Sequence, residues 1–235
     1  KAAPLAAGVL DPVVRSAHAD GVPVEPRIVG RDAELREALD VLDAGDHLVV
    51  LGEAGVGKSR LVREVARSLP RDQLVLGGGC MPLGADLPLL PVVEMLRALA
   101  RQDGGAVIRR VIDMAPSYVG QELTRVLPEL GVLDQAAPPV TADPQQTSAW
   151  QRERLFAGLR TAFATALSVR RLVCVIEDVH WADATTLDFL TYLTAPDASP
   201  RPSTVVTARR GEPLPEPVSG WLDSVLRLGG VGFLT

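Results

Sequence analysis

The 235-residue sequence is poor in the residues that mark several specialised protein classes. It contains two cysteines, Cys80 and Cys174, and neither belongs to a Cys-x-x-Cys or Cys/His pattern, so a disulfide framework is excluded and no zinc site is indicated. We expect both thiols to be reduced and buried in apolar, strand-like runs. Aromatic residues make up only 4%, which argues against a surface that stacks exposed bases.

Positive charge is not in excess, and long apolar runs are missing. The 24 Lys and Arg residues are outnumbered by 29 Asp and Glu, which gives a formal net charge of −5. A DNA-reading domain is usually basic, so we expect no direct nucleic-acid binding by this chain. No run approaches the ~20 apolar residues of a membrane span, so we expect no membrane partner and a cytoplasmic location. The apolar start runs into Asp11-Pro12, and we interpret it as the cut end of a longer protein.

The remaining composition favours one large globular domain, because 47% of the residues are hydrophobic and only 23% are charged. Residues 1–26 contain four prolines and are expected to form an arm or linker, followed by a domain over 27–235. Unbroken apolar runs predict strands that are buried on both faces, and helical patterns separate them. This alternation predicts an α/β fold with a parallel five-stranded sheet between layers of helices. The expected strands are 47–51, 73–77, 172–176, 203–208 and 225–228, and the main expected helices are 32–43, 58–68, 89–101, 106–114, 121–127, 147–169 and 184–193.

One glycine-rich segment carries the strongest functional signal. It matches G-x-x-x-x-G-K-[ST], the pattern of a phosphate-binding loop, between an expected strand and an expected helix. Its glycines let successive backbone N–H groups point at phosphate oxygens, and the helix N-terminus adds its positive dipole end. We expect Lys58 to bind the β- and γ-phosphates and Ser59 to bind Mg²⁺. The nucleotide-binding residues predicted here are Gly52, Glu53, Ala54, Gly55, Val56, Gly57, Lys58, Ser59 and Arg60.

A second strand is expected to bring carboxylates to this loop, because the apolar run 172–176 ends on Glu177 and Asp178. Adjacent side chains of a strand face opposite sides, but a turn at the strand end allows both acids to approach the phosphates. We assign Glu177 to the Mg²⁺ shell and Asp178 to the attacking water, as general base. The alternative is that two solvated acids merely end a strand.

Polar residues also follow the next strand and begin the next helix. Arg209 comes just after the expected strand 203–208, and an arginine at such a strand end could contact the γ-phosphate, a role that rests mostly on the family resemblance given below. The alternative for Arg209 is a surface basic pair with Arg210. Asp183 is expected to cap the helix 184–193, and His180 and Trp181 are expected to pack at the start of that helix.

Four segments together resemble a known family. They are Ile28-Val29-Gly30-Arg31, the loop 52–59, the stretch Glu177-Asp178-Val179-His180-Trp181-Ala182-Asp183, and Thr207-Ala208-Arg209. In this order they resemble the STAND class of signal-transduction ATPases within the AAA+-like P-loop superfamily. Within that class they resemble the nucleotide-binding domain of large LuxR-type, MalT-like transcriptional regulators. The resemblance extends over about residues 27–230.

The resemblance implies ATP or ADP and Mg²⁺ as ligands, with Ile28, Val29, Gly30 and Arg31 lining the adenine pocket. It implies the sheet of additional-strand P-loop ATPases, in which the Glu177-Asp178 strand and the Arg209 strand lie beside the phosphate-loop strand. It further implies a switch: ADP holds a closed form, ATP permits self-association, and slow hydrolysis resets the switch. Sensor and output domains (helical repeat, winged helix, DNA-binding) are then expected elsewhere in the protein. Glu177 departs from the pattern, because many relatives have Asp there.

Two other functions use the same loop. A small-molecule kinase would need a substrate pocket, for which residues 81–146 offer space and Arg101, Arg109, Arg110 and Arg125 are candidates. These arginines fall at helical spacing, which favours solvated helix faces. An AAA+ motor subunit would need an arginine that reaches a neighbour's γ-phosphate, and the sequence offers no convincing one.

Overall fold

The computed structural model describes residues 30–82, 88–102, 104–128, 144–195, 201–210, 214–227 and 231–234. The expected arm at 1–26 lies outside these residues, as do Ile28 and Val29 of the expected adenine pocket. Within the described part, no helix combines the length and the apolar character needed to cross a membrane.

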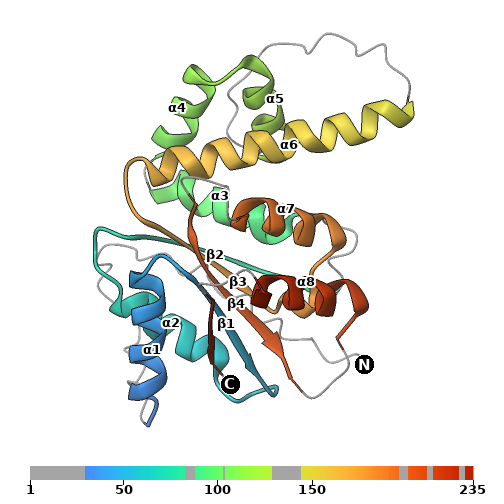
Figure 1. Cartoon of the computed structure of the whole chain (residues 1–235). Coiled ribbons are helices and arrows are strands. Elements are labelled where there is room, and N and C mark those ends of the chain that lie inside the picture. The colour runs from blue at the N-terminus through green and yellow to red at the C-terminus, as the bar shows by residue number, and fades with distance from the viewer. Residues whose placement is uncertain are drawn as a thin grey trace, which may run out of the picture.

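A parallel sheet lies at the centre of the molecule (Figure 1). Each strand runs parallel to its neighbours, and the four longer strands are almost entirely buried because helices cover both faces of the sheet. The prediction of an α/β fold with a parallel sheet is therefore confirmed. The strand order is β2-β3-β4-β1-β5, where β5 is short and pairs only with β1. The strands are β1 (His47–Gly52), β2 (Leu74–Gly79), β3 (Leu172–Glu177), β4 (Ser203–Arg209) and β5 (Val231–Leu234).

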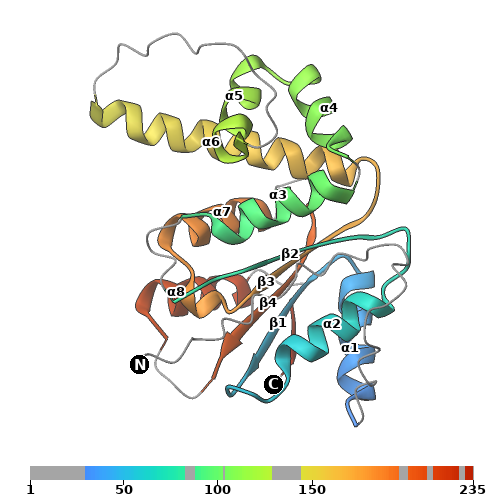
Figure 2. The ribbon, with the colours of Figure 1, turned by 180° about the vertical axis from the view of Figure 1, so that it is seen from behind.

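Helices cover the two faces of the sheet with two separate apolar cores (Figures 1 and 2). On one face α1 (Asp32–Asp43) and α2 (Lys58–Ser68) pack on Val50, Val175 and other alternate strand residues. On the other face α3, α7 and α8 pack on the intervening strand residues, and α4, α5 and α6 form an outer layer against α3 and α7. The bounds are α3 (Leu90–Gln102), α4 (Ala106–Met114), α5 (Ser117–Val126), α6 (Pro144–Leu167), α7 (Ala184–Thr194) and α8 (Glu216–Arg227).

The expected strand at 225–228 is wrong, because residues up to Arg227 belong to α8 and the last strand is Val231–Leu234. Val218, Trp221, Leu222 and Val225 are buried on one side of α8, at the spacing of a helix rather than a strand. The strand predicted at 73–77 also differs from the structure, since β2 continues through Gly78 to Gly79.

The neighbours of the phosphate-loop strand were predicted only in part. The prediction that the Arg209 strand lies beside it is confirmed, because β4 pairs with β1. The same prediction for the Glu177-Asp178 strand is wrong, because β4 lies between β1 and β3. All these strands are parallel, so their carboxyl ends still gather at one edge, and this edge carries the site.

Candidate functional site

The loop after β1 has the backbone that a phosphate cradle requires. It leaves the sheet at Gly52 and enters α2 at Lys58, so the strand and the helix expected around it are both present. Gly55 and Gly57 have φ of +77° and +93°, a left-handed conformation in which a side chain is unfavourable. A Cβ on Gly52 would lie 2.8 Å from Cγ1 of Val56. The backbone of the loop therefore requires glycine at these three positions.

Lys58 is the first residue of α2, where the loop ends, and it is buried (8% exposed). Its Nζ donates hydrogen bonds to the carbonyl oxygens of Gly52 (2.9 Å) and Glu53 (2.8 Å). Burial lowers the pKa of Lys58, the Asp178 carboxylate raises it, and the Arg209 guanidinium lowers it again. The structure thus brings the three predicted catalytic residues, Lys58, Asp178 and Arg209, into one electrostatic environment.

Glu177 is the last residue of β3, and it is buried next to Ser59 and Arg63 of α2. Burial raises the pKa of Glu177, as does the neighbouring Asp178 charge, while a hydrogen bond from the Ser59 side chain and the charge of Arg63 lower it. Oε2 of Glu177 is buried, and no residue in the described part of the chain donates a hydrogen bond to it.

This arrangement fits a divalent cation. A buried carboxylate oxygen without a donor is a costly feature that a cation would satisfy, and Mg²⁺ prefers oxygen ligands. Ser59 and Glu177, the two residues predicted to hold the metal, are in contact. Among the described residues no group of three or more His, Cys, Asp and Glu could hold a metal ion. A nucleotide-linked Mg²⁺ needs no such cluster, because phosphates and water supply most of its ligands.

Asp178 has an unusual backbone, with φ +54° and ψ 44°. The left-handed conformation costs a residue with a side chain ~1–2 kcal/mol, so local contacts must stabilise it. The backbone N–H of Asp178 donates to Oγ1 of Thr207 at 2.9 Å. The carboxylate is half-exposed, and its Oδ1 lies 3.9 Å from Nδ1 of His180. Thr207 was quoted only as part of the family pattern, and sequence reasoning gave it no role of its own.

Two arginines lie against the phosphate loop. Arg209 is the last residue of β4, not a residue beyond it, and it pairs with Gly52 in the register of the sheet. Arg31 donates from its Nη2 to the carbonyl oxygen of Val56 at 2.9 Å, which connects the segment before α1 to the tip of the loop. Arg60 lies exposed on the first turn of α2.

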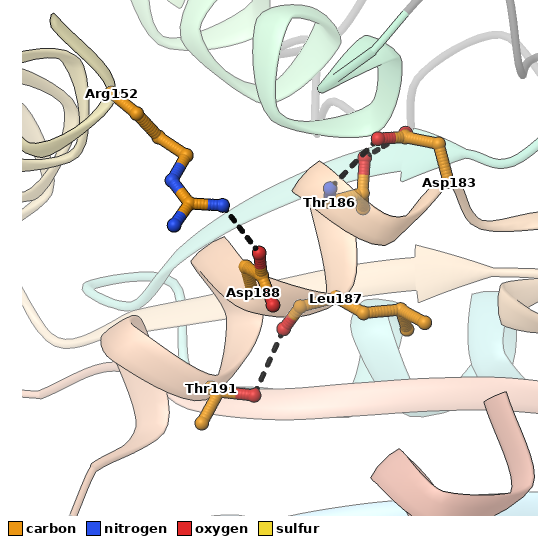
Figure 3. A network of polar contacts seen from close by, with 6 residues as sticks. All are labelled: Arg152, Asp183, Thr186, Leu187, Asp188 and Thr191. Atoms are coloured by element: carbon orange, nitrogen blue, oxygen red, sulfur yellow. Dashed lines mark hydrogen bonds and ion pairs between the residues drawn. The ribbon is translucent and has the colours of Figure 1, made fainter. Parts of the chain in front are cut away.

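Asp183 caps α7, as predicted: its Oδ1 accepts from the Thr186 N–H at 2.9 Å (Figure 3). The other oxygen, Oδ2, accepts from the hydroxyl of Thr186 and, at 3.3 Å, from the backbone N–H of Leu89. Asp183 therefore connects the start of α7 to the start of α3. Farther along α7, Asp188 pairs with Arg152 of α6 at 3.1 Å on the exposed side.

The sequence also matches a known protein family. Residues 27–206 match the model of the AAA ATPase domain. The chain belongs to the AAA ATPase domain family. Curated relatives of this AAA ATPase domain include an uncharacterized protein of Rhizobium meliloti (strain 1021), 28% identical over 217 residues, and protein MoxR of Methylorubrum extorquens, 28% identical over 112 residues. The alignments cover 84% and 45% of this chain but only 19% and 30% of those relatives' lengths.

Solved structures with similarity to this AAA ATPase domain are remote in sequence. A Walker-type ATPase of Pyrococcus abyssi is 16% identical, with a TM-score of 0.42 over 88% of this chain and 51% of that chain. A chain from Drosophila ORC bound to AT-rich DNA and Cdc6 is 11% identical, with a TM-score of 0.42 over 86% of this chain and 56% of that chain.

Proposed function

We propose that the chain is a nucleotide-dependent switch that binds ATP or ADP with Mg²⁺ and hydrolyses ATP slowly. The observation that carries this proposal is the buried Lys58, held on the loop carbonyls with Asp178 and Arg209 close enough to change its pKa. A phosphate group in the cradle would take the place of those carbonyls as the partner of the ammonium group.

In this proposal each residue has a separate task. The loop amides and the N-terminus of α2 bind the phosphates, and Lys58 neutralises charge on the β- and γ-phosphates. Ser59 and Glu177 hold Mg²⁺, which when bound neutralises charge that develops on the phosphate oxygens. Asp178 accepts the proton of the attacking water, and Arg209 contacts the γ-phosphate.

The switch role rests on the STAND-like order of motifs and on the length of the curated relatives. We propose an arm at 1–26 and an ATPase domain at 27–235, with sensor and output domains in other parts of a LuxR-type regulator. ATP would permit self-association, and Ile28–Arg31 would line the adenine pocket. The contact of Arg31 with Val56 supports the last point, because it joins this segment to the phosphate loop.

The first experiment denatures the purified chain, identifies any released nucleotide, and measures steady-state turnover with ATP and Mg²⁺. We expect bound ADP and a turnover well below about one per second, slower than a typical metabolic enzyme. Lys58→Ala should abolish triphosphate binding, whereas Asp178→Asn should bind ATP and lose hydrolysis. Asp188→Asn, which alters an exposed acid of α7, is the matched control.

Two results would overturn the proposal. Unchanged turnover in Asp178→Asn would remove the assigned base. An empty site with fast turnover that rises on addition of small metabolites would favour a kinase. The four arginines considered for that alternative are exposed on α3, α4 and α5, as expected for solvated helix faces: Arg101, Arg109, Arg110 and Arg125.

A further inference from the structure

The side chain of Thr207 forms a hydrogen bond between β3 and β4 just beyond the point where their backbone hydrogen bonds end. The last paired residues of the two strands are Ile176 and Val206. One residue further along each strand lie Glu177 and Thr207, and the chain of β3 then turns at Asp178. There the Asp178 N–H donates to the Thr207 hydroxyl at 2.9 Å instead of to a backbone carbonyl. Thr207 is buried (1% exposed), so water does not readily replace this contact.

The turn at Asp178 decides where its carboxylate points. Val175 contributes to the core under α1 and α2, and the alternation of a strand places Glu177 on that same face. Continued extended backbone would send Asp178 to the opposite face, toward α3 and α7. The positive φ of +54° interrupts the alternation instead. The charge of Asp178 acts on Lys58 and Glu177 on the side of α2, and also on Cys80, which belongs to the core on the side of α3.

Strand β4 is suited to hold this turn. Val205 belongs to the core under α1 and α2, so alternation places Thr207 and Arg209 on the same face as Val205. One side of β4 therefore offers a hydroxyl to Asp178 and a guanidinium to the phosphate loop. A residue with a side chain keeps a left-handed backbone only where surrounding contacts stabilise it. Such residues are found most often at functional sites.

We propose that Thr207 is a positioning residue for ATP hydrolysis, whose hydroxyl holds the left-handed turn that aims Asp178 at the phosphate loop. The inference rests on the proposed function, in which Asp178 is the general base. In this proposal Thr207 acts through the backbone of Asp178.

The test compares Thr207→Val, which keeps the shape and removes the acceptor, with Thr207→Ser, which keeps the hydroxyl. In Thr207→Val we expect kcat to fall about 5- to 10-fold, the effect of one lost hydrogen bond, while the Kd for ATP stays within about twofold. Thr207→Ser should stay close to wild type. In the Asp178→Asn background, Thr207→Val should cause no further loss of turnover.

A second readout needs no nucleotide. Amide hydrogen exchange in the nucleotide-free chain should become faster at Asp178 in Thr207→Val, while Ile176 in β3 keeps its protection. Thr207→Ala serves in both assays should Thr207→Val fail to fold.

The inference would be overturned if Thr207→Val, or Thr207→Ala in its place, kept the wild-type kcat and the wild-type exchange rate at Asp178. It would also be overturned if the variant lost kcat and ATP affinity to the same extent. A wild-type chain that hydrolyses no faster than Asp178→Asn would instead overturn the proposed function. In that case the exchange experiment still decides whether Thr207 holds the turn.

Discussion

Gly78 lies directly against Pro91: a Cβ on Gly78 would be 2.1 Å from the Pro91 carbonyl oxygen and 2.6 Å from its Cα. The first turn of α3 thus packs on the bare backbone of β2. This contact explains why glycine stands at position 78 inside a strand. A sequence pattern that treats glycine as a strand breaker instead predicted that β2 would end at Gly77.

Gly78→Ala should therefore destabilise the fold. The new methyl group would meet backbone atoms, which cannot move aside like a flexible side chain, so we expect the free energy of unfolding to fall by about 3 kcal/mol. Gly79→Ala is the matched control, because a Cβ there meets nothing within 4 Å. Urea denaturation of both variants measures the difference, and equal stabilities would show that α3 is not seated on β2 in this way.

Asp183→Ala should cost more stability than Asp188→Ala, although both remove a carboxylate from the region of α7 (Figure 3). The first change removes the cap of α7 and one of two acceptors of the Leu89 N–H, whose other acceptor is the Thr186 hydroxyl, together about 1–2 kcal/mol. The second removes an exposed ion pair with Arg152, which contributes roughly 0.5 kcal/mol or less. Thermal unfolding of the two variants checks this order, and a reversed order would contradict the capping role.

Arg209→Ala should weaken ATP binding about tenfold or more and ADP binding much less, because only ATP carries the γ-phosphate that Arg209 is proposed to contact. Arg210→Ala is the control: the Arg210 backbone N–H donates to Gly52, but its side chain is exposed. Titration of each variant with the two nucleotides measures the ratio. Equal weakening of ATP and ADP binding by Arg209→Ala would show that Arg209 does not contact the γ-phosphate.

His47 should make the fold less stable in acid. Its Nδ1 lies 2.9 Å from Thr204 Oγ1, and burial, with a smaller contribution from Arg201, lowers its pKa from 6.5 to about 4, against an opposing effect of Asp46. Between these values the unfolded chain binds the proton and the folded chain does not. The free energy of unfolding is thus fully retained above about pH 6.5 and falls as the pH drops toward 4, by up to about 3 kcal/mol.

The variant His47→Asn separates this effect from that of other titrating groups. It keeps a polar group near Thr204 and has no proton to bind in this range. We expect a smaller loss of stability between pH 7.5 and 4.5 than in the wild-type chain, measured by urea denaturation at each pH. The same pH dependence in both proteins would show that His47 does not carry it.

Much of the site could be predicted from the sequence because its parts are local. The loop 52–59 depends on short-range backbone geometry, and its glycines lie where positive φ or a close contact requires them. Glu177 and Asp178 directly follow an apolar run, and Asp183 directly precedes a helix. Neighbouring residues along the chain encode such features, and the structure agrees with each of these placements.

The features that were predicted wrongly, such as the neighbours of the phosphate-loop strand and the end of β2, depend on contacts between segments that are distant in the sequence. The sequence alone determined which segments become strands and helices in most of the chain, and which polar residues end them. Only the tertiary structure decided that β4 lies between β1 and β3, that Gly78 accepts a helix against its backbone, and that Thr207 holds the turn at Asp178. The physical reason is that strand pairing and helix packing select among several locally acceptable arrangements through the surface they bury together, and no single stretch of sequence contains that information.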